Sequence, residues 1–106
     1  MSKVVRMPAA SSANMIVLVN GDNVGIALSD IGAGEQAVDR CSQRVAVREA
    51  IPLGHKLALR TIGRDEAVIR CGMTIGLATQ PIEKGALVHV HNLASRYLTN
   101  VEDHYE

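Results

Sequence analysis

The chain has almost no aromatic residues. None of its 106 residues is tryptophan or phenylalanine, and the two tyrosines, Tyr97 and Tyr105, both lie near the C-terminus. A core must therefore be built from aliphatic side chains and methionine, and the β-branched ones among them favour strands because they pack well on a pleated surface. Small side chains each bury little apolar area, and each Å² of buried apolar area stabilises the fold by about 25 cal/mol. We therefore expect marginal stability, and self-association when a partner surface is missing.

The chain also lacks a charge imbalance and a long apolar run. Eleven basic residues balance eleven acidic ones, which excludes the basic surface that nucleic-acid binding requires. The longest apolar run, residues 15–19, is too short to span a bilayer, and the first 14 residues lack the apolar stretch of a signal peptide. We expect a cytoplasmic protein that binds neither nucleic acid nor a membrane.

Cysteine is scarce as well. Cys41 and Cys71 are the two in the chain, and their spacing matches no zinc or redox motif. Because disulfides are rare in the cytosol, reduced thiols are expected.

Short apolar runs between glycine and polar turns predict an all-β domain. Residues 15–19 and 24–28 flank the sequence Asn-Gly-Asp-Asn, which is typical of a hairpin turn. Residues 38–49 are ambiguous, although 44–48 alternate like a strand, and further strands are predicted within 56–62, 68–70, 75–78 and 87–90. With nine glycines as punctuation, this pattern is typical of one compact domain of short strands. We expect a disordered leader over residues 1–14, the domain over 15–93, and a C-terminal tail over 94–106 that could hold a short helix.

One regularity recurs along the chain. Ile31, Ile62 and Ile82 each precede a polar or glycine turn, and a valine follows six or seven residues later. The pattern indicates a repeated strand–turn–strand corner, too short and irregular to be a solenoid repeat.

Two segments carry histidines for which the fold has no obvious use. In residues 51–59 (Ile-Pro-Leu-Gly-His-Lys-Leu-Ala-Leu), His55 follows a turn glycine, and imidazole can act as a general acid or base near neutral pH. In residues 88–92 (Val-His-Val-His-Asn), His89 and His91 would face the same way along a strand. Two such clusters on a small domain suggest a shared site.

Each of these residues also has a structural interpretation. His55 could bond to backbone and stiffen its turn, and Lys56, on the opposite strand face, could bind a substrate carboxylate or simply be solvated. His89 and His91 could clamp an anion or supply two metal ligands, but a hydrogen-bonded pair is the better interpretation for this chain alone. The amides of Asn23 and Asn92 suit substrate hydroxyls, yet both residues, like Asp22, sit where a turn favours them.

Four motifs in order resemble one known family. Residues 21–25 (Gly-Asp-Asn-Val-Gly), 51–59, 68–76 (Val-Ile-Arg-x-Gly-x-x-Ile-Gly) and 88–92 are similar to the SAF-type domain of altronate and galactarate dehydratases, which also occurs as a free-standing small subunit of related lyases such as sulfolactate sulfo-lyase. The resemblance implies a β-clip fold over about residues 15–93. The chain departs from the family at Cys71, where a tyrosine is common, which puts the substrate preference in question.

The resemblance also implies a function. It implies the small subunit of a hydro-lyase that removes water from a 2-hydroxy acid together with a large catalytic subunit, which would hold a divalent metal such as iron. His55 would handle protons, and Asn23, Lys56, His89, His91 and Asn92 would line the substrate pocket, with no metal ligand from this chain. One alternative is a sulfolactate sulfo-lyase subunit, which cleaves a carbon–sulfur bond. Another is a non-catalytic carbohydrate-binding or assembly module, because the fold alone does not define function.

Overall fold

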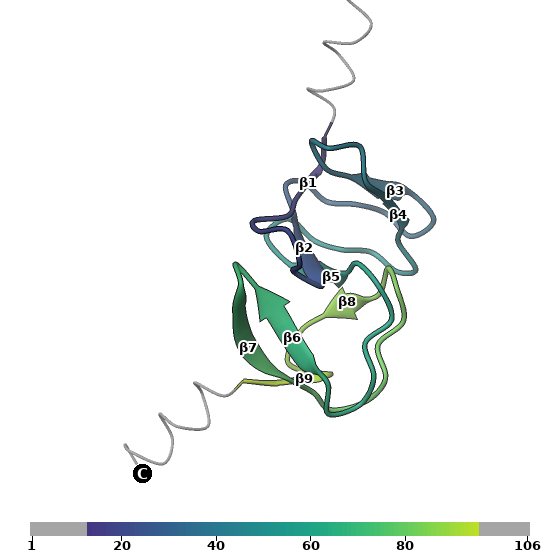
Figure 1. The fold of residues 1–106 in the computed structure, drawn as a ribbon. Coiled ribbons are helices and arrows are strands. Elements are labelled where there is room, and N and C mark those ends of the chain that lie inside the picture. Colours follow the sequence, from purple (N-terminus) through teal and green to yellow (C-terminus); the bar gives the residue numbers. More distant parts are fainter. Residues whose placement is uncertain (1–12, 96–106) are drawn as a thin grey trace, which may run out of the picture.

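A computed structural model of the chain describes residues 13–95 (Figure 1). This part contains nine short strands and no helix, which confirms the all-β prediction. The strands are β1 (Met15–Ile16), β2 (Val24–Ala27), β3 (Gln36–Val38), β4 (Arg44–Ala46), β5 (Lys56–Ala58), β6 (Ala67–Arg70), β7 (Met73–Ala78), β8 (Leu87–Val88) and β9 (Leu93–Ser95). No helix of the described residues could cross a membrane.

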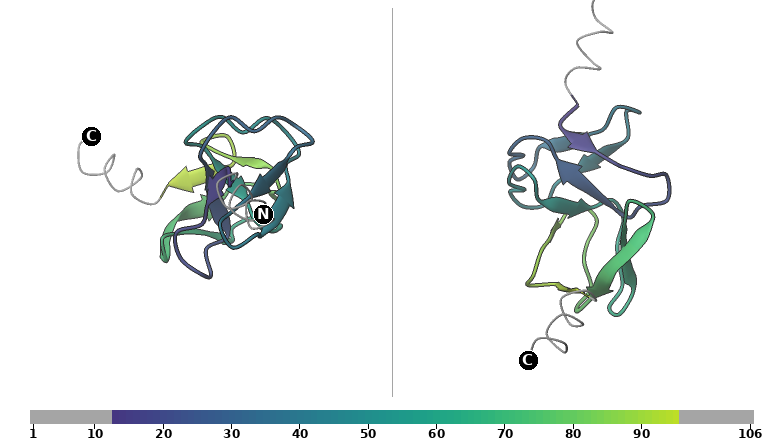
Figure 2. Two further views of the ribbon diagram at one scale, coloured as in Figure 1. Left: turned by 90° about the horizontal axis from the view of Figure 1, so that it is seen from above. Right: turned by 90° about the vertical axis from the view of Figure 1, so that its left-hand side faces the viewer.

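A four-stranded antiparallel sheet occupies the middle of the molecule, in the order β1-β2-β5-β8. The β3–β4 hairpin lies beyond one side of it and the three-stranded sheet β6-β7-β9 beyond the other (Figures 1 and 2). The predicted hairpin of residues 15–28 is confirmed, since Met15 pairs with Ala27 and Ile16 with Ile26.

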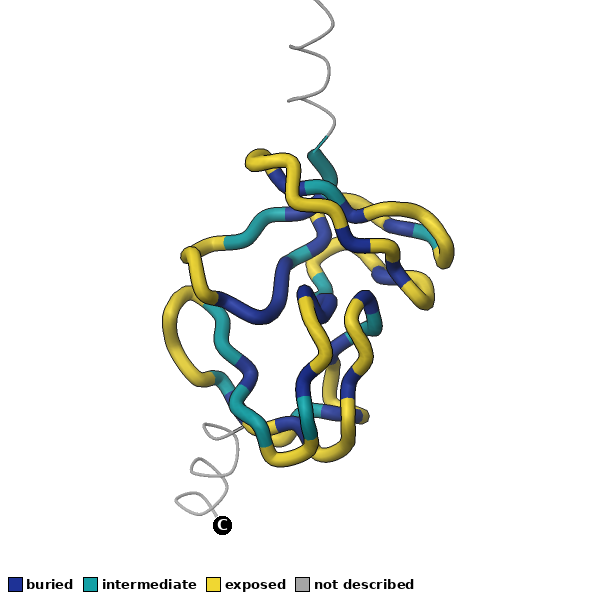
Figure 3. Tube along the Cα trace, turned by 45° about the vertical axis from the view of Figure 1, so that its right-hand side comes forward, coloured by how far each residue is buried: buried dark blue, intermediate teal, exposed yellow. Residues whose placement is uncertain are grey.

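The middle sheet separates two hydrophobic clusters. Successive side chains of a strand point to opposite faces, so Leu57 of β5 joins the cluster shared with β3 and β4, whereas its neighbour Ala58 joins the cluster shared with β6 and β7. Buried and exposed positions accordingly alternate along much of the chain (Figure 3). The two clusters together consist of aliphatic side chains and one methionine, Met15, as the composition predicts.

The recurring isoleucine corner is part of a repeat with a step of 31 residues. Ile31 bridges to Ile51, and Ile62 bridges to Ile82 in the same antiparallel way. Further backbone hydrogen bonds recur with this step: Gly34 N to Val47 O and Asp65 N to Ala78 O; Val47 N to Glu35 O and Ala78 N to Glu66 O; Gly54 N to Ala27 O and Gly85 N to Ala58 O; His55 N to Pro52 O and Ala86 N to Glu83 O. The repeat is therefore more regular than the sequence indicates, and it places β2, β5 and β8 in equivalent positions.

The structure changes three boundaries. Strand β3, which pairs with β4, begins two residues before the ambiguous stretch and ends at its first residue, Val38. Asn14, assigned to the leader, belongs to the fold, because its side chain accepts a hydrogen bond from Val38 N at 2.7 Å and its amide donates to Gln36 O at 3.0 Å. Ala94 and Ser95 are in strand β9 and not in a helix. Residues 1–12 of the predicted leader and 96–106 of the predicted tail lie outside the described residues.

Candidate functional site

The two histidine-bearing segments meet in space. The ring centroids of His55 and His89 are 4.8 Å apart, with the ring planes tilted by 50°. The pairing of β5 with β8 causes this contact: Lys56 is the register partner of Val88, so the residue before β5 faces the residue after β8. His55 is half-buried and His89 is exposed. The expectation of a shared site is therefore supported by the positions of these two imidazoles.

A tight turn fixes His55. Its backbone N–H donates to Pro52 O at 3.0 Å, and Gly54 has a φ of 84°, a left-handed conformation that glycine adopts without strain. The ring Nδ1 lies 3.4 Å from Leu53 O. This long contact favours a proton on Nδ1, which leaves the lone pair on Nε2 to accept a proton from another group.

A second turn, built by Asn92, fixes His89. The Asn92 side chain is buried; its oxygen accepts from His89 N at 2.9 Å and its amide donates to Leu87 O at 2.8 Å, while Asn92 N donates to His89 O at 3.0 Å. Strand β8 ends at Val88. The expectation that His89 and His91 share one face of a strand is therefore wrong, because the chain turns between them, and His91 lies exposed within that turn.

The side chain of Asn23 also bonds to backbone. Only 1% of this residue is exposed; its amide donates to Ala67 O at 2.9 Å and its oxygen accepts from Ile69 N at 2.7 Å. Asn23 thus ties the start of β2 to β6. Substrate binding by Asn23 and Asn92 stays a prediction, and a substrate would have to compete with these backbone groups.

Lys56 lies apart from the imidazoles. Lys56 is the first residue of β5 and lies two positions before Ala58, so its side chain points to the same face, toward the cluster shared with β6 and β7. Because side chains alternate along a strand, His55 is directed to the other face. Lys56 lines a pocket of about 520 Å³ together with Arg70, Cys71, Met73, Thr74, Ile75 and Leu93. Burial, and then the positive charge of Arg70, lower the pKa of Lys56.

Arg70 is the polar residue of this pocket that sequence reasoning missed. Its Nε is buried, and it has no hydrogen-bond partner. The residue lies 14 positions from Lys56 along the chain, and only the packing of β6 beside the middle sheet brings the two cations to one pocket. Arg70 belongs to the third sequence motif, but nothing in that motif indicated that it shares a pocket with Lys56.

Asp22 serves the backbone. Its buried carboxylate accepts hydrogen bonds from Val19 N at 3.1 Å, Cys71 N at 2.8 Å and Gly72 N at 2.9 Å. Burial raises the pKa of Asp22, but these hydrogen bonds, with a contribution from the charge of Arg70, outweigh it and hold the pKa below its usual value. Asp22 therefore joins the first hairpin turn to the β6–β7 turn.

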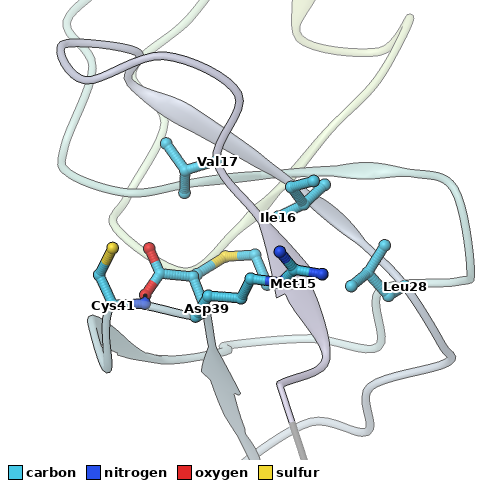
Figure 4. A pocket seen from close by; sticks show the side chains of 7 residues that line it. Met15, Ile16, Val17, Leu28, Asp39 and Cys41 are labelled. Carbon is cyan, nitrogen blue, oxygen red and sulfur yellow. Dashed lines mark hydrogen bonds between the residues drawn. The ribbon is translucent and has the colours of Figure 1, made fainter. Parts of the chain in front are cut away.

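A different pocket, of about 400 Å³, opens beside β1 (Figure 4). Its polar groups come from Asp39, Arg40 and Cys41, and Asp39 Oδ1 already accepts from Cys41 N at 2.9 Å. Neither histidine lines it. Both cysteines are free and exposed, which confirms the expectation of thiols.

Residues 13–95 contain no cluster of three or more histidine, cysteine or acidic side chains that could hold a metal ion. The imidazole pair offers two nitrogen ligands at most, whereas a catalytic metal site usually has three protein ligands. The described residues therefore do not form a metal site by themselves.

Fold and site together define a small all-β domain that presents two imidazoles at its surface. The chain belongs to the altronate/galactarate dehydratase SAF domain family, whose model matches residues 13–96. The resemblance stated from the motifs is thereby confirmed.

The relatives of the chain are lyases. It is 39% identical over 87 residues to the (2R)-sulfolactate sulfo-lyase subunit alpha of Chromohalobacter salexigens, covering 82% of this chain and 88% of that subunit. It is 41% identical to the altronate dehydratase of Escherichia coli and 38% identical to that of Bacillus subtilis, covering 77% of this chain but 16% of each dehydratase. The chain thus corresponds to a small subunit or domain of such lyases.

Proposed function

We propose that the chain is the small subunit of a sugar-acid dehydratase of the altronate/galactarate type, acting on a 2-hydroxy acid in the cytoplasm with a separate large catalytic subunit. The meeting of His55 and His89 at an exposed surface carries this proposal. The pair is open to solvent on this chain, and excluding water from it requires a covering surface. A relative that matches over nearly its whole length is named a subunit, which supports the need for a partner.

In the proposed reaction a base removes the proton α to the carboxylate, and the β-hydroxyl group takes up a proton and leaves as water. The resulting enol tautomerises to a 2-keto acid. His55 is the proposed proton-handling group, since Nε2 is available when Nδ1 faces Leu53 O. His89, which Asn92 holds in place, lies beside His55. The proposed substrate-binding residues are His89, His91, Asn92, Lys56 and Asn23.

A divalent metal such as iron, held by the large subunit, would polarise the substrate. The described residues of this chain do not provide a complete ligand set for it. Neither subunit alone is then sufficient, and the isolated chain is expected to be inactive.

The second candidate is the small subunit of a sulfolactate sulfo-lyase. The specific observation in its favour is coverage: the chain matches 88% of that subunit alpha but 16% of the altronate dehydratases. The proton chemistry would be the same, with sulfite in place of water as the leaving group.

A non-catalytic binding or assembly module is the remaining alternative. Leu53 is 61% exposed and Val90 is 75% exposed, and they flank the imidazole pair along the chain. An apolar rim of this kind suits contact with another protein. In such a module the histidines would contact the partner and take no part in turnover.

One assay separates these functions. The large subunit, with and without this chain, is supplied with altronate, galactarate or sulfolactate, and 2-keto acid is measured. Turnover only with both chains supports a lyase subunit, and the substrate consumed identifies the leaving group. Equal turnover without this chain would leave only the binding or assembly module.

Variants then test the histidine. Loss of a general acid or base lowers kcat by about 10²–10⁴-fold, so His55→Ala should do so with the complex intact by gel filtration. His104→Ala, which removes a histidine outside all four motifs, is the matched control and should not change kcat. Unchanged kcat in His55→Ala would remove the catalytic assignment.

A further inference from the structure

Arg70 has a buried polar atom with no partner. Its Nε is out of contact with solvent and makes no hydrogen bond. A buried donor without a partner costs about 1–3 kcal/mol, and more when the group is charged, so native structures rarely keep one unless a water or ion completes it. The guanidinium of Arg70 is therefore left without an acceptor among the described residues, and its terminal nitrogen atoms, unlike Nε, can be reached by an acceptor in the pocket.

The surroundings of Arg70 specify the charge of that acceptor. Lys56 lines the same pocket, and its pKa is lowered by burial and by Arg70. Asp22 is near enough for its charge to couple with Arg70, but its carboxylate oxygens already accept three backbone N–H groups. Among the described residues, the ion pair found is a different one, between Arg60 and Glu66. Two cations thus share the pocket without a carboxylate of their own.

The shape and lining of the pocket specify an organic anion. Its volume of about 520 Å³ is within the range of about 300–1,000 Å³ for small-molecule sites. Met73, Ile75 and Leu93 offer apolar surface to a carbon chain, and Thr74 offers a hydroxyl group. An inorganic ion would leave this apolar surface uncovered.

We propose that the pocket between β5 and β6–β7 is a binding site for the carboxylate group of a small organic acid, with Arg70 as the main donor and Lys56 as the second charge. The terminal N–H groups of the Arg70 guanidinium donate to a carboxylate oxygen, and the anion reduces the repulsion between the two cations. The site is distinct from the imidazole pair, which alternation places on the other face of β5. Lys56 is shared with the proposed substrate-binding residues of the lyase, whereas Arg70 belongs to this site alone, and binding here can be tested without turnover.

An NMR titration of the isolated chain tests the site without any large subunit. Galactarate, a sugar dicarboxylate, is the probe, and galactitol, with the same carbon skeleton and no carboxylate, is the neutral control. At constant ionic strength, galactarate should shift the amides of residues 70–75 and Arg70 Nε–H in a saturable way, and it should raise the pKa of Lys56. Galactitol should produce no such shifts.

Substitutions identify the donor. Arg70→Gln should weaken galactarate binding at least about tenfold, since a hydrogen bond to a charged group is lost, and it should raise the pKa of Lys56 in the free chain. Arg60→Gln, at an exposed arginine paired with Glu66, is the matched control and should leave the affinity unchanged. If Arg70→Gln does not fold, Lys56→Gln should still weaken binding severalfold.

Four results would overturn the proposal. One is a galactarate affinity that is the same in the wild type and in a folded Arg70→Gln variant. Another is equal binding of galactitol, and the third is the absence of saturable shifts at residues 70–75. Sulfate binding as tight as galactarate would contradict the organic class. None of these outcomes bears on turnover with the large subunit, so the two proposals fail separately.

Discussion

Replacing Asp22 by asparagine should strongly destabilise the fold. The carboxylate accepts three backbone hydrogen bonds, from Val19, Cys71 and Gly72. Asparagine has the same shape but turns one acceptor oxygen into an amide donor that faces a backbone N–H, and it makes the remaining bonds neutral. A hydrogen bond to a charged group is worth about 1.5–3 kcal/mol, and an unsatisfied buried donor costs about 1–3 kcal/mol. We therefore expect a loss of about 2–4 kcal/mol in the free energy of unfolding, on the scale of those values.

Urea denaturation at pH 7 measures this loss, and thermal denaturation should show a drop in Tm of roughly 10–25 °C for a domain of this size. The matched control is Asp30→Asn. Asp30 is exposed and accepts one backbone hydrogen bond, from Leu53 N at 2.8 Å, so its substitution should cost less than about 1 kcal/mol.

The pH dependence supplies an independent check. The folded pKa of Asp22 lies below its ordinary value, so its stabilisation is complete above the unfolded pKa of about 3.9 and is lost as the pH falls through the folded pKa. The difference in stability between the wild type and Asp22→Asn should thus shrink below about pH 4. A smaller effect than that of Asp30→Asn, or an equal difference at pH 7 and in strong acid, would refute the assigned role of the carboxylate.

Three further outcomes are expected. Gly54→Ala and Gly85→Ala should each lower the free energy of unfolding by about 1–2 kcal/mol, because each glycine has a positive φ. A Cβ at Gly85 would also overlap the Ala46 carbonyl oxygen, so the urea midpoint should fall further for Gly85→Ala. Equal midpoints for the two variants would contradict this packing. Asn23→Ala removes two bonds to β6 and should cost about 2–3 kcal/mol by the same measurement even without substrate; an unchanged midpoint would disprove its structural role. Both thiols are free and exposed, so a thiol reagent should label both in the native chain and dithiothreitol should not shift the midpoint, whereas a large shift would reveal a disulfide.

Local patterns were enough to predict the first hairpin and strands β4 to β8, but not β3 or β9. Glycine and asparagine mark turns through their own backbone preferences, which is why the hairpin of residues 15–28 could be placed before its partners were known. The turn at residues 89–92 could not, because Val-His-Val-His alternates like a strand. The buried side chain of Asn92, which bonds to His89 and Leu87, overrides that alternation.

The candidate site was predictable in part for a similar reason. The motifs singled out His55 and His89, but their contact depends on the register of β5 with β8. Arg70 belongs to the third motif, but its place in a pocket could not be predicted, since its neighbour Lys56 comes from another sheet. The 31-residue repeat was largely hidden because its conserved feature is backbone hydrogen bonding, whereas its side chains differ, as in Gly34 and Asp65.

The 31-residue repeat allows His55 to be compared with the residues at equivalent positions one step earlier and one step later. The position of His55 is occupied by Val24 one step earlier and by Ala86 one step later, on strands that share one sheet. A duplicated backbone unit can keep its packing in the outer copies while the central copy diverges. Exchanging the side chains of positions 55 and 86 would therefore move the imidazole to a turn with the same backbone hydrogen bond and a glycine φ of 87° in place of 84°. Position 24, which is fully buried, does not offer such a turn.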